Sequence, residues 1–184
     1  MIDVETMSLT PRAAVASIGA VAFDPWGEEP LNQRGRVLHV RLDLGAQASR
    51  EFDGETVAWW LRQSEGARQS IVIAQEPPRT ALLRLADFYE ANGVDTAWSY
   101  GAAFDHPVVA DLWAWARSKP IEERLTLDYA IPYHRQLCAR TVCFLSGVSR
   151  SRNLGIEHSA IDDALLQAEW LRLAIKALGV PRGK

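Results

Sequence analysis

An apolar run from Val15 to Phe23 constrains the fold of this chain more than any other feature of the sequence. Turn-forming residues bound the run on both sides, Thr10-Pro11-Arg12 before it and Asp24-Pro25-Trp26-Gly27 after it. A short apolar run with such limits is typical of a buried β-strand. Because Ile2 to Glu5 alternate between apolar and acidic side chains, they are also expected to form a strand, and the two segments together predict a β-hairpin.

Residues 36–44 predict a third strand, and most of the remaining chain predicts helices. The alternation in 36–44 places Leu38, Val40, Leu42 and Leu44 on one buried face. Helical spacing of apolar residues and stop signals such as Asn92-Gly93 define the other elements. We expect helices over 56–61, 64–74, 80–92, 105–116, 140–145 and 161–178, a fourth strand over 96–100, and a fifth over either 126–130 or 131–133. This order predicts a single mixed α/β domain over residues 1–184.

Composition excludes several classes of protein. The chain has 184 residues, of which 48% are hydrophobic and 23% are charged, as in an ordinary globular protein. The two cysteines, Cys138 and Cys143, are too few for a secreted disulfide framework. No apolar run approaches the roughly 20 residues of a membrane span, and the acidic first strand is unlike a signal peptide. We therefore expect a cytoplasmic protein with no membrane partner.

The charge pattern argues against binding of nucleic acid by bulk electrostatics but permits local binding. The net charge is −3 and the pI is about 5.8. Between Tyr129 and Ile156 there is no acidic residue, and the arginines of this stretch are Arg135, Arg140, Arg150 and Arg152. Such a run is either a solvated face or a segment that contacts phosphate.

Asp3 and Glu5 are the first candidates for chemistry. Two positions apart on a strand, their side chains leave the same face about 6–7 Å apart. Carboxylates held so close repel each other, which raises the pKa of one member of an unliganded pair, and a bound Mg²⁺ or Mn²⁺ ion removes that penalty. Because an Asp-x-Glu pair occurs often by chance, the pair alone is weak evidence for a metal site.

Asp105 and His158 each allow a structural and a functional interpretation. Asp105 follows the expected fourth strand, where an aspartate caps a helix or serves a site at the carboxyl end of a strand. His158 precedes the last helix, whose first turn holds Asp162 and Asp163. These two acids complement the helix dipole, while a histidine at such a junction suits a general base.

Taken together, these residues resemble a known family. In order, Asp3 and Glu5, then Asp105, then His158 with Asp163 five positions on, resemble the DEDDh branch of the 3′–5′ exonuclease superfamily. The chain is most similar to a bacterial and phage group of 3′–5′ exoribonucleases often labelled exodeoxyribonuclease VIII-like. The segments that carry this resemblance are Ile2–Met7, Ile18–Pro25, Thr56–Leu61 with Gln63-Ser64, Trp98–Asp105 and His158–Ala164.

The resemblance implies a ribonuclease H-like fold, with a mixed sheet whose first three strands are antiparallel and which is flanked by helices. It implies a 3′–5′ exonuclease that acts on single-stranded or 3′-overhanging RNA, with DNA as a possible substrate, and releases nucleoside 5′-monophosphates. Two Mg²⁺ ions, or Mn²⁺ in their place, would be held by Asp3, Glu5, Asp105 and Asp163. His158 would accept the proton of the attacking water. Helical spacing favours Asp162 as the neighbour of His158, whereas the family spacing selects Asp163, with Asp162 as its solvated neighbour.

Further residues are candidates for the substrate and for a partner. Thr6, Met7 and Ser8 follow Glu5 and are expected to line the terminal nucleotide, with Met7 against its base. Phe104 either stacks on a base or packs beside a helix start, and Arg150 and Arg152 are candidates for phosphate contact. Since adjacent Trp59 and Trp60 cannot both face one core, one is expected to be half-exposed, and a homodimer is expected from relatives of the ribonuclease T type.

One departure from the family pattern and two other functions stay open. Where the group often has an Arg-Asp-x-Arg-Thr-like segment, this chain has Gln136-Leu137-Cys138-Ala139-Arg140-Thr141, so Cys138 replaces the acid. A catalytically weak nucleic-acid-binding adaptor, or a proofreading-type exonuclease directed to DNA, would use the same fold. The sequence does not decide between RNA and DNA.

Overall fold

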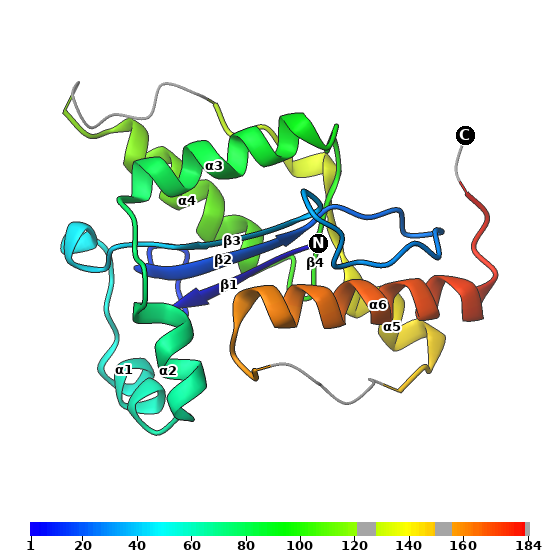
Figure 1. Cartoon of the computed structure of the whole chain (residues 1–184), viewed down its shortest axis with the longest axis horizontal. Helices are drawn as coiled ribbons and strands as arrows, with labels where there is room; N and C mark the ends of the chain where they lie inside the picture. Colours follow the sequence, from blue (N-terminus) through cyan, green and yellow to red (C-terminus); the bar gives the residue numbers. More distant parts are fainter. Residues whose placement is uncertain (121–127, 150–155, 183–184) are drawn as a thin grey trace.

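The structure is a computed structural model and describes residues 1–120, 128–149 and 156–182. Strands β1 (Ile2–Thr6), β2 (Val15–Val21) and β3 (Val37–Arg41) form an antiparallel sheet in the order β1-β2-β3, and β4 (Ala97–Ser99) pairs in parallel with β5 (Gln136–Cys138). The helices of the described residues are α1 (Gly54–Leu61), α2 (Glu65–Val72), α3 (Pro78–Ala91), α4 (Asp105–Arg117), α5 (Ala139–Ser146) and α6 (Ala160–Leu178) (Figure 1).

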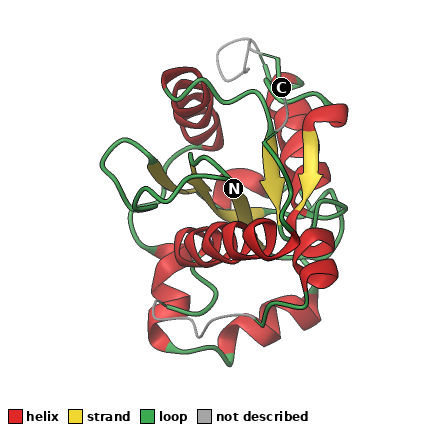
Figure 2. Ribbon diagram, turned by 90° about the vertical axis from the view of Figure 1, so that its right-hand side faces the viewer, coloured by secondary structure: helices red, strands yellow, loops and turns green. Residues whose placement is uncertain are grey.

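Helices cover both faces of the three-stranded sheet. Helices α3 and α4 lie on one face and α6 runs across the other, as two perpendicular views show (Figures 1 and 2). The larger hydrophobic core lies between the sheet and α3 and α4, and a second core lies under α6. Every residue of β2 is buried because this central strand is covered from both sides, as the uninterrupted apolar run predicts.

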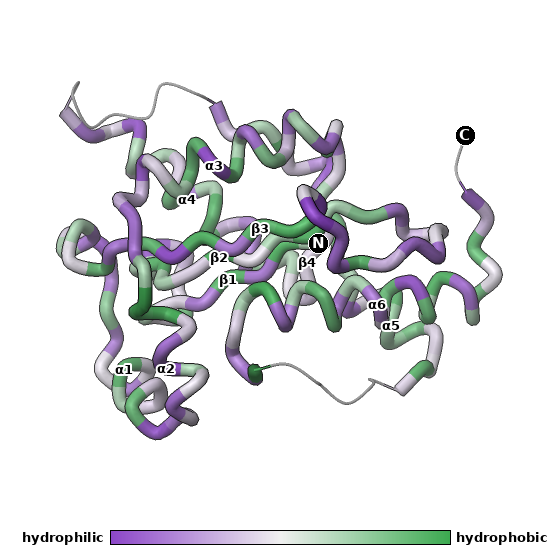
Figure 3. Tube along the Cα trace, viewed as in Figure 1, coloured by the Kyte–Doolittle hydropathy of each residue, from purple (hydrophilic) through white to green (hydrophobic). Residues whose placement is uncertain are grey.

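The hydropathy pattern follows these layers. Hydrophobic residues concentrate in the strands, whereas hydrophilic residues dominate the loop between β2 and β3 (Figure 3). Among the described residues, no helix combines the length and the hydrophobicity that a membrane crossing needs.

Most of the expected elements are confirmed, with small changes at their ends. The β-hairpin forms as expected, and β3 stops at Arg41 instead of continuing to Leu44. Val40 and Leu42 are buried, and Leu38 and Leu44 pack against core clusters, so the expected face of this strand is correct. The six helices lie at the expected places with ends that differ by a few residues.

The expected position of the fifth strand is wrong. Part of the range 126–130 lies outside the described residues, and Ile131 to Tyr133 form a bend that enters a 3₁₀ turn. Ile131 is nevertheless buried as a single side chain in the main core, which explains its strand-like signal. The strand is Gln136–Cys138, whose side chains are only half-buried and whose conformation is fixed by hydrogen bonding to β4.

Candidate active site

Strand β1 presents Asp3 and Glu5 on the face of the sheet that α6 covers. Ile2, Val4 and Thr6 are buried while the two acids between them are half-buried, so the predicted alternation is present. Asp3 pairs with Gly19 of β2 and Glu5 pairs with Ser17. The register shifts between Glu5 and Thr6, which ends the regular pairing directly after the second acid.

Gly19 allows α6 to approach this face of the sheet closely. A Cβ atom on Gly19 would lie 2.2 Å from the carbonyl carbon and oxygen of Ala160, the first residue of α6. No side chain fits in that space, so glycine is the residue that permits the contact. Since Gly19 is also the pairing partner of Asp3, the start of α6 is brought beside the acids of β1.

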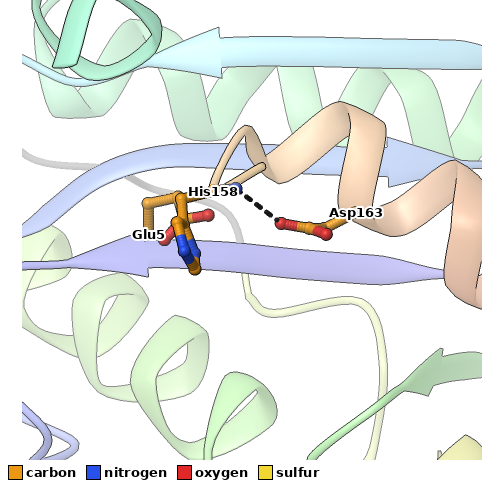
Figure 4. A group of neighbouring side chains, drawn as sticks. All are labelled: Glu5, His158 and Asp163. Atoms are coloured by element: carbon orange, nitrogen blue, oxygen red, sulfur yellow. Dashed lines mark hydrogen bonds between the residues drawn. The ribbon is translucent and has the colours of Figure 1, made fainter. Parts of the chain in front are cut away.

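Asp163 and His158 complete the cluster from the start of α6. Ligand atoms of Glu5, His158 and Asp163 all lie within 4.8 Å of one another, and Figure 4 shows their side chains converging. The backbone N–H of His158 donates to Asp163 Oδ2 at 3.2 Å. Asp163 is buried, whereas Asp162 is half-buried and its Oδ2 accepts from the Ile156 N–H at 3.2 Å, so Asp162 is less solvated than expected.

Asp105 joins the cluster from α4, the helix on the face of the sheet opposite α6, and its charge acts on both Asp3 and Glu5. It is the first residue of α4 and its side chain is only 5% exposed. Its Oδ2 accepts from the Gly101 N–H at 3.2 Å, and the Val4 N–H also faces the carboxylate. Phe104, not Asp105, occupies the cap position of the helix, so the simple capping interpretation of Asp105 is wrong.

Burial and mutual repulsion dominate the electrostatics of this cluster. Burial raises the pKa of Asp3 well above its usual range, and the charges of Asp105, Glu5 and Asp163 raise it further. Burial, then Asp163 and Asp105, raise the pKa of Glu5 to about 8. Burial also raises the pKa of Asp105 to about 6, although backbone N–H groups oppose the shift. Acids in this state are stabilised by a bound cation.

The donor set fits a hard divalent cation. Oxygen ligands from carboxylates are those that Mg²⁺ and Mn²⁺ prefer, and the cluster supplies them from β1, α4 and α6. Gln167 Oε1 is buried and has no hydrogen-bond partner among the described residues. Since Gln167 bonds Asp3 through its Nε2, this unpaired acceptor oxygen lies close to the acids. A cation here would relieve both the repulsion and the unpaired acceptor.

Gln167 and Gly19 are the site residues that sequence reasoning missed. Gln167 Nε2 donates to Asp3 Oδ1 at 2.7 Å and partly offsets the raised pKa of Asp3. Its position four residues after Asp163, on the same face of α6, is the signal that would have identified it. Gly19 had no comparable signal, because a glycine in a strand has several explanations.

Thr6, Met7 and Ser8 lie beside Glu5 but are occupied by contacts within the protein. Met7 is buried against Trp60 and other apolar side chains, and its N–H donates to the Ala14 carbonyl. Thr6 Oγ1 donates to the Ser8 carbonyl, and Ser8 Oγ donates to Glu51. These three side chains therefore offer little exposed surface to a nucleotide.

The remaining candidates are spread around the site. Phe104 is half-buried and packs against the main core, next to Asp105. Arg150 and Arg152 lie outside the described residues. Arg140 is exposed, and its guanidinium lies 4.8 Å from the centre of the Tyr100 ring. It is also near Asp105, because a Cβ built on Gly101 would lie 3.7 Å from Arg140 Nη2 and 3.6 Å from Asp105 Oδ2. Cys138 is a free thiol at the end of β5, directly before α5.

Comparison with known proteins identifies the family. The profile of the Rv2179c-like family, described as a 3′–5′ exoribonuclease domain, matches residues 1–175. The chain belongs to this family. Its membership confirms the resemblance drawn from the ordered motifs and supports exonuclease activity.

A phage protein provides a second comparison. The "Exodeoxyribonuclease" of Enterobacteria phage T4 is 33% identical to this chain over 124 residues, which cover 61% of the chain. The alignment spans 54% of the phage protein, so the chain corresponds to about half of that relative's length.

Proposed function

We propose that this chain is a metal-dependent 3′–5′ exonuclease that hydrolyses single-stranded or 3′-overhanging nucleic acid, with RNA favoured, to nucleoside 5′-monophosphates. The observation that carries this proposal is the convergence of Asp3, Glu5, Asp105 and Asp163, which come from three separate elements and interact electrostatically in one cluster. The exonuclease family of the chain supplies the type of reaction.

In this proposal, the four acids hold two Mg²⁺ ions, for which Mn²⁺ can substitute. The bound ions supply charge stabilisation at the scissile phosphate and lower the pKa of a water molecule. Asp3, which interacts electrostatically with each of the other three acids, would help to hold both ions. Glu5 and Asp163, which lie beside His158, would serve the attacking water, and Asp105 would serve the leaving oxygen. The chain's own contribution is to hold these oxygens close together, with Asp3 fixed by Gln167 and Asp105 by the Gly101 N–H.

His158 is the proposed acceptor of the proton from the attacking water. Its ring nitrogen lies within 4.8 Å of carboxylate oxygens of Glu5 and Asp163, which supports a role in proton transfer beside these two acids. A positioned general base contributes about 10²–10⁴-fold to the rate.

The preference for RNA rests on the description of the family as exoribonucleases. The name of the T4 relative favours DNA as the alternative substrate. A ribonuclease H-like fold over residues 1–184 is part of the proposal, and the antiparallel β1–β2–β3 sheet with the parallel β4–β5 pair agrees with it. A cytoplasmic location and a homodimer also remain proposals, the first supported by the free thiols of Cys138 and Cys143.

The test is degradation of 5′-labelled single-stranded RNA and DNA of the same sequence, with Mg²⁺, Mn²⁺ or EDTA. We expect a ladder of products shortened from the 3′ end, lost with EDTA and lost in Asp3→Asn. Asp95→Asn is the matched control, because Asp95 is exposed and pairs with Arg135. Equal binding without cleavage in the wild type and Asp3→Asn would support an adaptor instead, and cleavage of DNA alone would reverse the substrate preference.

A further inference from the structure

The turn that carries His158 has an unusual backbone. His158 has a φ of +62°, a left-handed conformation that non-glycine residues rarely adopt. Such a conformation persists only where surrounding contacts hold it. The hydrogen bond from its N–H to Asp163 is one such contact, and the others come from α1 and α2.

Helices α1 and α2 contact the His158 turn at several points. The ring of Trp59 meets the imidazole edge to face, with centroids 4.7 Å apart, and Trp60 lies at 6.4 Å. Ser70 Oγ lies 3.2 Å from the His158 carbonyl oxygen and 2.7 Å from that of Ala67, so its hydrogen is shared between them. These contacts reach both the ring and the backbone of His158.

The two helices are themselves fixed to the sheet beside the acids. Trp60 Nε1 donates to the carbonyl of Thr6, the residue after Glu5, at 2.9 Å. Arg41 of β3 donates through Nε to the Ser70 carbonyl at 2.7 Å. Because α1 and α2 are bonded to the sheet, the contacts of Trp59 and Ser70 hold His158 at a fixed place relative to the acids of the sheet.

We propose that Trp59 and Ser70 are positioning residues for His158: Trp59 fixes the direction of the imidazole, and Ser70 fixes the backbone of its turn. Edge-to-face pairs of aromatic rings are favourable, so the imidazole cannot turn away from Glu5 and Asp163 without losing the contact with Trp59. This inference rests on the proposed function, because it assigns a reason for holding His158 in place.

Kinetics of variants test the inference. In Trp59→Ala we expect kcat to fall about 100-fold, the cost of misplacing a catalytic group by about 1 Å, with KM changed less than about twofold. Trp59→Phe keeps an aromatic edge and should recover most of kcat. Trp26→Ala is the matched control, because Trp26 is similarly exposed and bonds the Val180 carbonyl instead. A raised KM with unchanged kcat in Trp59→Ala would mean that Trp59 contacts substrate, and would overturn the inference.

A readout that needs no activity separates this inference from the proposed function. At one fixed pH, the imidazole protons of His158, assigned by comparison with His158→Gln, should carry a ring-current shift in the NMR spectrum. Loss of that shift in Trp59→Ala assigns it to the indole, whereas Ser70→Ala keeps both tryptophans, so a changed shift in Ser70→Ala reports movement of the imidazole. If the wild type shows no nuclease activity but the shift changes in Ser70→Ala, the proposed function fails and the positioning stands. If His158 shows no such shift in the wild type, or keeps it in Ser70→Ala, the positioning is wrong, whatever the activity.

Discussion

Gly19→Ala is the substitution that most directly tests how the site is assembled. The added Cβ would lie 2.2 Å from the backbone carbonyl of Ala160, whereas ordinary contact begins at 3.4 Å. Because the clashing atoms are backbone, no side-chain rotation relieves the overlap, and β2 and α6 must separate by about 1.2 Å. Asp163 lies three residues after Ala160 and would move with the helix, away from Asp3 and Glu5.

The expected losses follow from that displacement. Overpacking of this kind costs about 1–3 kcal/mol of unfolding free energy, which for a chain of 184 residues lowers Tm by about 2–12 °C. A 1 Å misplacement of catalytic groups costs about 10²-fold in rate, so kcat should fall by about that factor in protein that is still folded. The Tm is measured by differential scanning fluorimetry, folding by circular dichroism, and kcat by release of nucleotides.

A second glycine provides the control. A Cβ on Gly54, at the start of α1, would meet nothing within 4 Å, so Gly54→Ala should keep both Tm and kcat. If Gly19→Ala matched the wild type in Tm and kcat, α6 would not need its close contact with β2, and the account of how the acids converge would be refuted.

Three further predictions concern charge. The pKa of Glu5 is raised to about 8 and that of Asp105 to about 6, so the metal-free folded protein binds more protons than the unfolded chain between these values and the usual ones. Its unfolding free energy should therefore fall as the pH rises from about 4.5 to about 8. For the same reason, Mg²⁺ should raise Tm more at pH 8 than at pH 5. A metal-free Tm that rises through this window would contradict that sign. Asp163→Asn, which removes one repelling charge, should raise the metal-free Tm at pH 8 while abolishing cleavage, and a lower Tm would show that repulsion is not dominant. Arg140→Gln should reduce the slope of log affinity for single-stranded RNA against log salt concentration by about 0.7, measured by fluorescence anisotropy. Arg135→Gln is the control and should leave this slope unchanged, because Arg135 already pairs with Asp95.

The sequence by itself predicted most of the helices and strands and the acids that we propose for the site. The alternation in β1 was sufficient to place Asp3 and Glu5 on one face, because the side-chain period of a strand is fixed by its backbone. The apolar run of β2 was sufficient to predict a buried strand, and the order of the motifs was sufficient to identify the family.

Tertiary structure decided everything that depends on which elements meet. The fifth strand was misplaced because β5 is defined by its hydrogen bonds to β4, and not by a hydrophobic period of its own. Thr6, Met7 and Ser8 follow Glu5 in sequence, yet they face α1 and its surroundings because Trp60 and Glu51 contact them. The convergence of the acids depends on Gly19, where a missing side chain lets α6 approach the sheet. A period in sequence records which side of an element is buried, but the partner that buries it is set by packing between distant segments.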